Sequence, residues 1–99
     1  PSVLDGDAVI AACRASGGTG HLISDEEVWT CQRRLAREEG IFSEPAGAVA
    51  LAGALKAWRR GEIDPEAAVV CLVTGSGFKD VTSVERLNAD ASADWVEWD

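Results

Sequence analysis

The stretch AVVCLVTGSGFKD, residues 68–80, decides how this chain is expected to fold. An apolar run over residues 67–73 ends at Thr74 and passes directly into a Gly-Ser-Gly turn. Apolar side chains at consecutive positions, without alternation, are typical of a parallel strand that is covered on both faces. We therefore predict a central strand at 67–73 that ends in a glycine-containing turn.

The sequence before this run predicts a helix, a short strand and a second helix. Residues 5–16 form the first helix, which ends at two glycines. TGHLIS, residues 19–24, has the length and composition of a short strand. The second helix begins with a capping box, because Ser24 and Glu27 have the S-x-x-E spacing, and it ends at Gly40.

A third helix is predicted over residues 46–60, after the extended connection IFSEP. Its first two turns, AGAVALAGA, are small and apolar on every side, which predicts burial all round. Residues 62–66, EIDPE, form a turn that leads into the central strand. Residues 81–88 are compatible with a further helix. We expect residues 1–84 to belong to one domain and residues 85–99 to form a peripheral tail.

This order of helix, strand, helix, helix and strand is α/β in class. It predicts an incomplete three-layer domain, because a strand that is apolar on both faces needs neighbours on each side and only one other strand is present. The unpaired sheet edge would favour self-association, or association with the remainder of a longer protein. The chain begins at Pro1 and contains no methionine, which also fits a fragment.

Composition limits the classes of function. The chain has 99 residues, 46% of them hydrophobic, and a net charge of −8, so a nucleic acid or an anionic membrane is not an expected partner. Cys13, Cys31 and Cys71 are far apart, and His21 is the only histidine, so a metal site is not expected. No targeting or membrane-spanning segment is evident, and reduced thiols favour a cytoplasmic protein.

Thr74 stands where a ligand site is expected, because open α/β sheets bind ligands at the carboxyl ends of their strands. Gly75 allows a close approach of the backbone to a ligand, although a glycine turn also occurs for geometric reasons alone. Glu44 precedes Pro45 at the start of the third helix, where its carboxylate either contacts a ligand or caps the helix amides. TGSG matches neither a dinucleotide fingerprint nor a P-loop.

Three segments in this order, SGGTGHLISDEEV, LAREEGIFSEPAGAVALAGALK and VVCLVTGSGFKD, resemble the C-terminal part of the threonine synthase family. These are pyridoxal-phosphate enzymes of fold type II, in the tryptophan-synthase β-like superfamily. The resemblance covers residues 1–84 and implies the large domain of such an enzyme. Phe78 stands where the family pattern has leucine.

The resemblance implies a reaction in which O-phosphohomoserine and water give threonine and phosphate. It implies that Thr74 hydrogen-bonds the pyridine nitrogen of pyridoxal 5'-phosphate and that Gly75 lets the strand end approach the ring. Glu44, Pro45 and Ala46 would line the other side of the pocket.

The family's cofactor-binding lysine and its phosphate loop lie earlier in the sequence, so no catalytic residue is expected here. We therefore expect these 99 residues to be inactive alone. The alternative is a non-catalytic module that keeps the packing without the cofactor and self-associates. A small-anion or nucleotide binder that uses TGSG is a third possibility.

Overall fold

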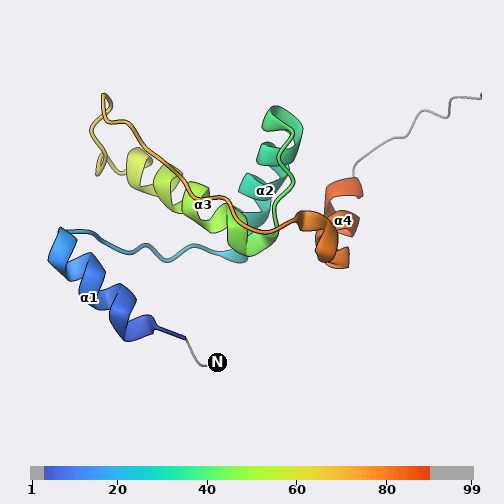
Figure 1. The fold of residues 1–99 in the computed structure, drawn as a ribbon. Helices are drawn as coiled ribbons and strands as arrows, with labels where there is room; N and C mark the ends of the chain where they lie inside the picture. The colour runs from blue at the N-terminus through green and yellow to red at the C-terminus, as the bar shows by residue number, and fades with distance from the viewer. Residues whose placement is uncertain (1–3, 90–99) are drawn as a thin grey trace, which may run out of the picture.

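A computed structural model describes residues 4–89 of the chain, and in this range the secondary structure is helical (Figure 1). The elements are α1 (Gly6–Ser16), α2 (Asp25–Glu39), α3 (Pro45–Arg59), the short 3-10 helix η1 (Gly77–Lys79) and α4 (Val81–Asn88). Helices α2 and α3 pack against each other, and α4 follows directly on η1. None of the helices in the described range is both long and apolar enough to cross a membrane.

The capping box that was predicted for α2 is confirmed. The Ser24 hydroxyl accepts a hydrogen bond from the Glu27 amide at 3.2 Å, and the Ser24 amide donates to the Glu27 carboxylate at 2.8 Å. Acidic residues 25–27 occupy the first turn, where the helix dipole favours negative charge. Gly40 ends the helix in the left-handed conformation, with φ of 69°.

The core is the seam between α2 and α3. It consists of Val28, Cys31 and Leu35 from α2 and of Ala48 and Ala52 from α3. Alanine on the α3 side lets the two helix axes approach closely, since interaxial distance follows side-chain size at the contact. The cluster is small, as expected for a chain of this length.

Helix α3 begins at Pro45, one residue before the predicted start, because proline suits the first helical position. The prediction of burial all round is wrong for this chain. Ala48 is fully buried and Ala52 is 5% exposed, whereas Val49 is 42% exposed. The reason is that α2 covers one side of the helix, while within residues 4–89 the apolar run 67–73 covers another side only in part.

The two predicted strands do not form, so the predicted order with strands is not seen in this chain. Residues 19–24 and 67–73 are irregular, and the sole β-pairing in the described range is an isolated antiparallel bridge between Ser43 and Ser76. A strand is stabilised by the hydrogen bonds and side-chain pairs of a neighbour. Neither segment has such a neighbour here, so their apolar composition alone does not produce a sheet.

The apolar run 67–73 instead lies along α3, as Figure 1 shows. Val69 and Cys71 line an apolar cavity of about 250 Å³ together with Leu51 and Trp58 of the α3 helix. The alternate side chains Val70 and Leu72 are 87% and 77% exposed. Val69 itself is 51% exposed, so α3 covers one face of the run only in part, and the other face is uncovered.

Helix α1 forms where it was predicted but lies apart from the α2–α3 core (Figure 1). It contributes no buried residue, and Asp5 does not cap it through its side chain. Helix α4 extends from 81 to 88, across the expected boundary at residue 84. The rest of the predicted tail, with Trp95 and Trp98, lies outside the described residues, so this division of the chain stays a prediction.

Replacement of a seam residue tests this core. Leu35→Ala is expected to lower the free energy of unfolding by about 2–5 kcal/mol, because the cavity left between rigid helices refills only in part. Val49→Ala, at an exposed position of α3, is the control and should change stability by less than about 1 kcal/mol. Urea unfolding followed by helix circular dichroism measures both, and equal losses would contradict the assignment of the core.

Candidate functional site

The structure brings the two segments of the predicted site together. The Gly77 amide donates to the Phe42 carbonyl at 2.9 Å, and the Glu44 amide donates to the Gly75 carbonyl at 3.2 Å. With the Ser43–Ser76 bridge between them, these bonds hold residues 42–44 against residues 75–77. Segments more than thirty positions apart in sequence therefore share one small antiparallel contact at the start of α3.

Two glycines are required at this contact. A Cβ at Gly47 would overlap the backbone carbonyl of Thr74, so only glycine lets α3 approach the end of the apolar run this closely. Gly75 has φ of 64°, a conformation that favours glycine, and the Glu44 side chain fills the space that its Cβ would take. The expectation that Gly75 allows a ligand to approach closely stays a prediction, because the group that lies against Gly75 here is the Glu44 side chain.

Aromatic packing closes the other end of the contact. A Cβ at Gly77 would lie 2.6 Å from the Phe42 ring, so the ring leaves no room for a side chain at this position. Phe42 and Phe78 meet edge to face, with ring centroids 4.9 Å apart and an interplanar angle of 83°. This pair fixes the turn that leads from the apolar run into η1.

The five predicted site residues lie around this contact. Thr74 and Gly75 are exposed, Glu44 and Pro45 are half-buried, and Ala46 is exposed on the first turn of α3. The Thr74 hydroxyl makes no hydrogen bond within residues 4–89. Its donor and acceptor capacity is therefore available to a ligand.

Glu44 does not cap the amides of α3 through its side chain, which was one of the two open alternatives. Its carboxylate instead forms an ion pair with Lys79, with 2.7 Å between Oε2 and Nζ. Lys79 is 60% exposed in its side chain and Glu44 24%, so solvent screens the pair in part. This ion pair joins the two segments of the site through their side chains.

A group of buried polar residues that was not predicted from the sequence lies behind the site, namely Gln32, Ser43 and Ser83. The signal for Gln32 was present, because it follows Val28 by four positions and precedes Leu35 by three on the apolar face of α2. A glutamine on such a face needs hydrogen-bond partners inside the protein.

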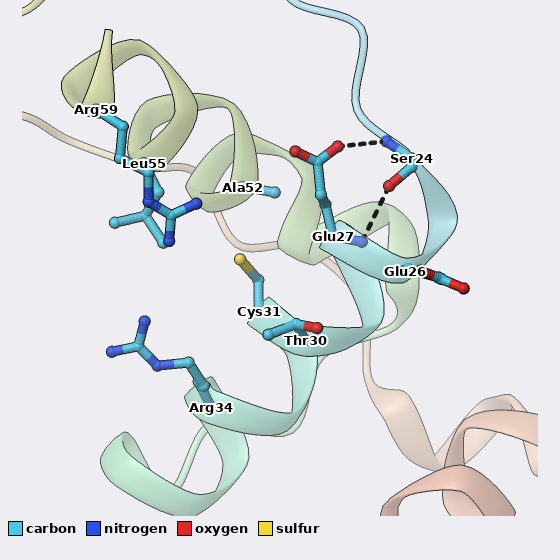
Figure 2. A pocket seen from close by; sticks show the side chains of 9 residues that line it. All are labelled: Ser24, Glu26, Glu27, Thr30, Cys31, Arg34, Ala52, Leu55 and Arg59. Carbon is cyan, nitrogen blue, oxygen red and sulfur yellow. Dashed lines mark hydrogen bonds between the residues drawn. The ribbon is translucent and has the colours of Figure 1, made fainter. Parts of the chain in front are cut away.

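A second hollow lies between α2 and α3, with a volume of about 270 Å³ (Figure 2). Arg34 and Arg59 approach it from the two helices, and the Cys31 thiol points toward Ala52 at its base. Burial raises the pKa of the Cys31 thiol, which makes it a poor nucleophile. None of the five predicted site residues lines this hollow.

Comparison with known proteins identifies the family. Residues 2–75 match the family described as pyridoxal-phosphate dependent enzyme, and the chain belongs to this family. The match ends at Gly75, within the turn that follows the apolar run, and it includes Glu44, Pro45, Ala46 and Thr74.

Among curated proteins, the chain is similar to threonine synthases. It is 42% identical over 90 residues to threonine synthase of Methanocaldococcus jannaschii, which covers 91% of this chain and 21% of that protein. It is 45% identical over 74 residues to threonine synthase of a Synechocystis species, covering 75% of this chain and 19% of that protein. The chain spans about a fifth of the length of these relatives.

Gly47→Ala tests the close approach of α3 to Thr74. We expect it to weaken the contact between the two segments by about 1–3 kcal/mol, because the added methyl overlaps backbone atoms. Amide exchange of Glu44 and Gly77, measured by NMR, reports the contact. Gly53→Ala on the same helix is the matched control: its Cβ meets nothing within 4 Å, so it should stabilise the helix by roughly 0.5–1 kcal/mol. Unchanged exchange in Gly47→Ala would contradict the model of the site.

The Glu27 carboxyl should titrate below its usual pKa of 4.5, chiefly because the Ser24 amide and hydroxyl hydrogen-bond to it. The ionised form is favoured in the folded chain, so its stabilisation is present above pH 4.5 and is lost as the pH falls through the lowered pKa. NMR titration of the side-chain carbon measures this value. Lys56→Gln should leave the pKa below 4.5, since Lys56 is a lesser cause than Ser24. A midpoint at or above 4.5 in the unmodified chain would refute the assignment.

Proposed function

We propose that this chain is the C-terminal part of a pyridoxal-phosphate dependent threonine synthase, an enzyme that converts O-phosphohomoserine and water to threonine and phosphate. The observation that carries the proposal is the convergence of Thr74 and Gly75 with the Glu44–Ala46 segment. The family membership and the threonine synthase relatives support it.

The residues present fit one edge of the cofactor. Thr74 has an exposed hydroxyl without a partner in the described part of the chain, and the next residue is Gly75, against which the Glu44 side chain packs. When bound, pyridoxal phosphate withdraws electrons from the substrate carbon. The Thr74 hydroxyl would donate a hydrogen bond to the ring nitrogen and would bring no charge, so the nitrogen would stay largely unprotonated.

Glu44, Pro45 and Ala46 form the other wall of this site. Pro45 fixes the backbone at the first turn of α3. The Glu44–Lys79 ion pair holds the carboxylate beside Gly75. A carboxylate already paired with a lysine has less tendency to attract a proton to a neighbouring ring nitrogen.

The complete enzyme would supply the layers that this chain lacks. Residues 68–74 make no backbone hydrogen bonds within the described range, and Val70 and Leu72 are almost fully exposed. These features support the proposal that 67–73, and with it 19–24, become strands of the sheet when the remainder of the enzyme is present. The chain alone would then bind cofactor poorly and be inactive.

Further parts of the proposal concern the setting of the enzyme. We place it in the cytoplasm with an amino-acid substrate and without nucleic acid or membrane as a partner. Residues 85–99 would form a peripheral tail.

The second candidate function is a non-catalytic module that self-associates. The exposed, unpaired apolar run specifically favours it, because such a segment readily pairs with another copy.

A chimera tests the proposed activity. Residues 1–84 would replace the matching segment of the Methanocaldococcus jannaschii threonine synthase, and phosphate release from O-phosphohomoserine would be measured. We expect turnover in the chimera, and in its Thr74→Val variant a loss on the order of ten- to hundredfold, since a lost hydrogen bond costs about 1–3 kcal/mol.

Thr74→Ser keeps the hydroxyl and is the matched control, with turnover within about threefold of the chimera. Full turnover in Thr74→Val would contradict the role of the hydroxyl. An intact fold with neither turnover nor pyridoxal-phosphate absorbance in the chimera would favour the self-associating module.

A further inference from the structure

Gln32 is a buried polar residue in the middle of the apolar face of α2. It is 4% exposed. Its side-chain amide donates to the carbonyl of Ser43 at 2.8 Å and to the hydroxyl of Ser83 at 2.9 Å. Both hydrogens of the amide nitrogen are thus used, one on each of two segments far apart in sequence.

Ser83, at the start of α4, continues the network. Its hydroxyl donates to the Asp80 carboxylate at 2.5 Å and accepts from Arg86 at 3.2 Å, while it also accepts from Gln32. A hydroxyl has one hydrogen and two lone pairs, so all of its capacity is used. The direction of every bond follows: Gln32 must donate, because the single hydrogen of Ser83 is given to Asp80.

The network reaches both segments of the candidate site from behind. Ser43 is 1% exposed and lies between Phe42 and Glu44, whose backbones bind Gly77 and Gly75. Asp80 follows η1, and its amide donates to the Gly77 carbonyl at 3.1 Å. Gln32 therefore connects α2 to residues 42–44 on one side and to residues 77–83 on the other.

Arg86 closes the network against the same helix. Its guanidinium lies 4.4 Å from the centre of the Trp29 ring, three positions before Gln32 on α2. It also stands within 4.0 Å of the Asp80 carboxylate. Asp80 and Arg86 are thus the charged groups that contact Ser83 directly.

We propose that Gln32 is a positioning residue, which sets the register between residues 42–44 and residues 75–77 by donating to Ser43 and Ser83 at once. Buried hydrogen bonds of this kind are costly to leave unmade, so the two acceptors hold their segments at a fixed distance from α2. The proposal rests on the proposed function only in taking residues 42–44 and 75–77 as a ligand site; the positioning itself needs no ligand.

The test uses Gln32→Glu in the 99-residue chain, with amide exchange read by NMR. The substitution keeps the size and shape of the side chain. It replaces the amide nitrogen, which donates to the Ser43 carbonyl and the Ser83 hydroxyl, with a carboxylate oxygen, which cannot donate. We expect exchange of the Glu44 and Gly77 amides to accelerate at least about tenfold, with mid-helix amides of α2 and α3 within about threefold of the unmodified chain. Lowering the pH should restore part of the protection, since the protonated carboxyl of the variant again donates one hydrogen bond.

Unchanged exchange at Glu44 and Gly77 would overturn the proposal, and so would an equal acceleration at every amide, because that is the result of a purely global role. If Gln32→Glu does not fold, Ser83→Ala provides the same comparison, since it removes the link to α4 and leaves α2 intact. No cofactor is used, so the outcome is independent of the role proposed for Thr74.

Discussion

The contact between the start of α3 and the end of the apolar run is the constraint on which the site depends. Two backbone hydrogen bonds, which together form the Ser43–Ser76 bridge, hold the segments together, and Gly47 makes room for the Thr74 carbonyl. A side chain at Gly47 would force these backbones apart, and one at Gly75 would be strained at its positive φ and would displace the Glu44 side chain. Thr74, Glu44 and Pro45 would then no longer share one surface, although each would keep its own local structure.

The second feature on which the structure depends is the absence, within the described residues, of a partner for the outer face and the backbone of the apolar run 67–73. Helix α3 covers Cys71 in part and leaves Val69 51% exposed, while Val70 and Leu72 are 87% and 77% exposed. Burial of an aliphatic side chain is worth about 1.5–3 kcal/mol, so a partner that covers the open face and pairs the backbone would be strongly favoured. The same property supports both candidate functions, completion of an enzyme sheet and self-association. The comparisons favour the first, because the chain belongs to the family of pyridoxal-phosphate dependent enzymes and is similar to threonine synthases.

Local signals in the sequence predicted the helices well. The Ser24 and Glu27 capping box, the glycine at 40 and Pro45 each act within one turn, so their effects do not depend on distant segments. The meeting of Thr74 with Glu44 followed from the family resemblance. The strands at 19–24 and 67–73 failed because a strand depends on neighbours that a single segment does not contain. The burial of Ser43 and Ser83 likewise depends on how α2 and α4 pack, which the sequence pattern alone does not specify.

Native mass spectrometry tests the central claim most directly. The chain would be mixed with the Methanocaldococcus jannaschii threonine synthase from which the matching segment has been removed, and with pyridoxal phosphate; the matching segment is 42% identical to this chain. We predict a complex that contains both chains in equal number and retains the cofactor, with less cofactor retained when Thr74 is replaced by valine. Homo-oligomers of the chain without cofactor, and no association with the complementary part, would contradict the account.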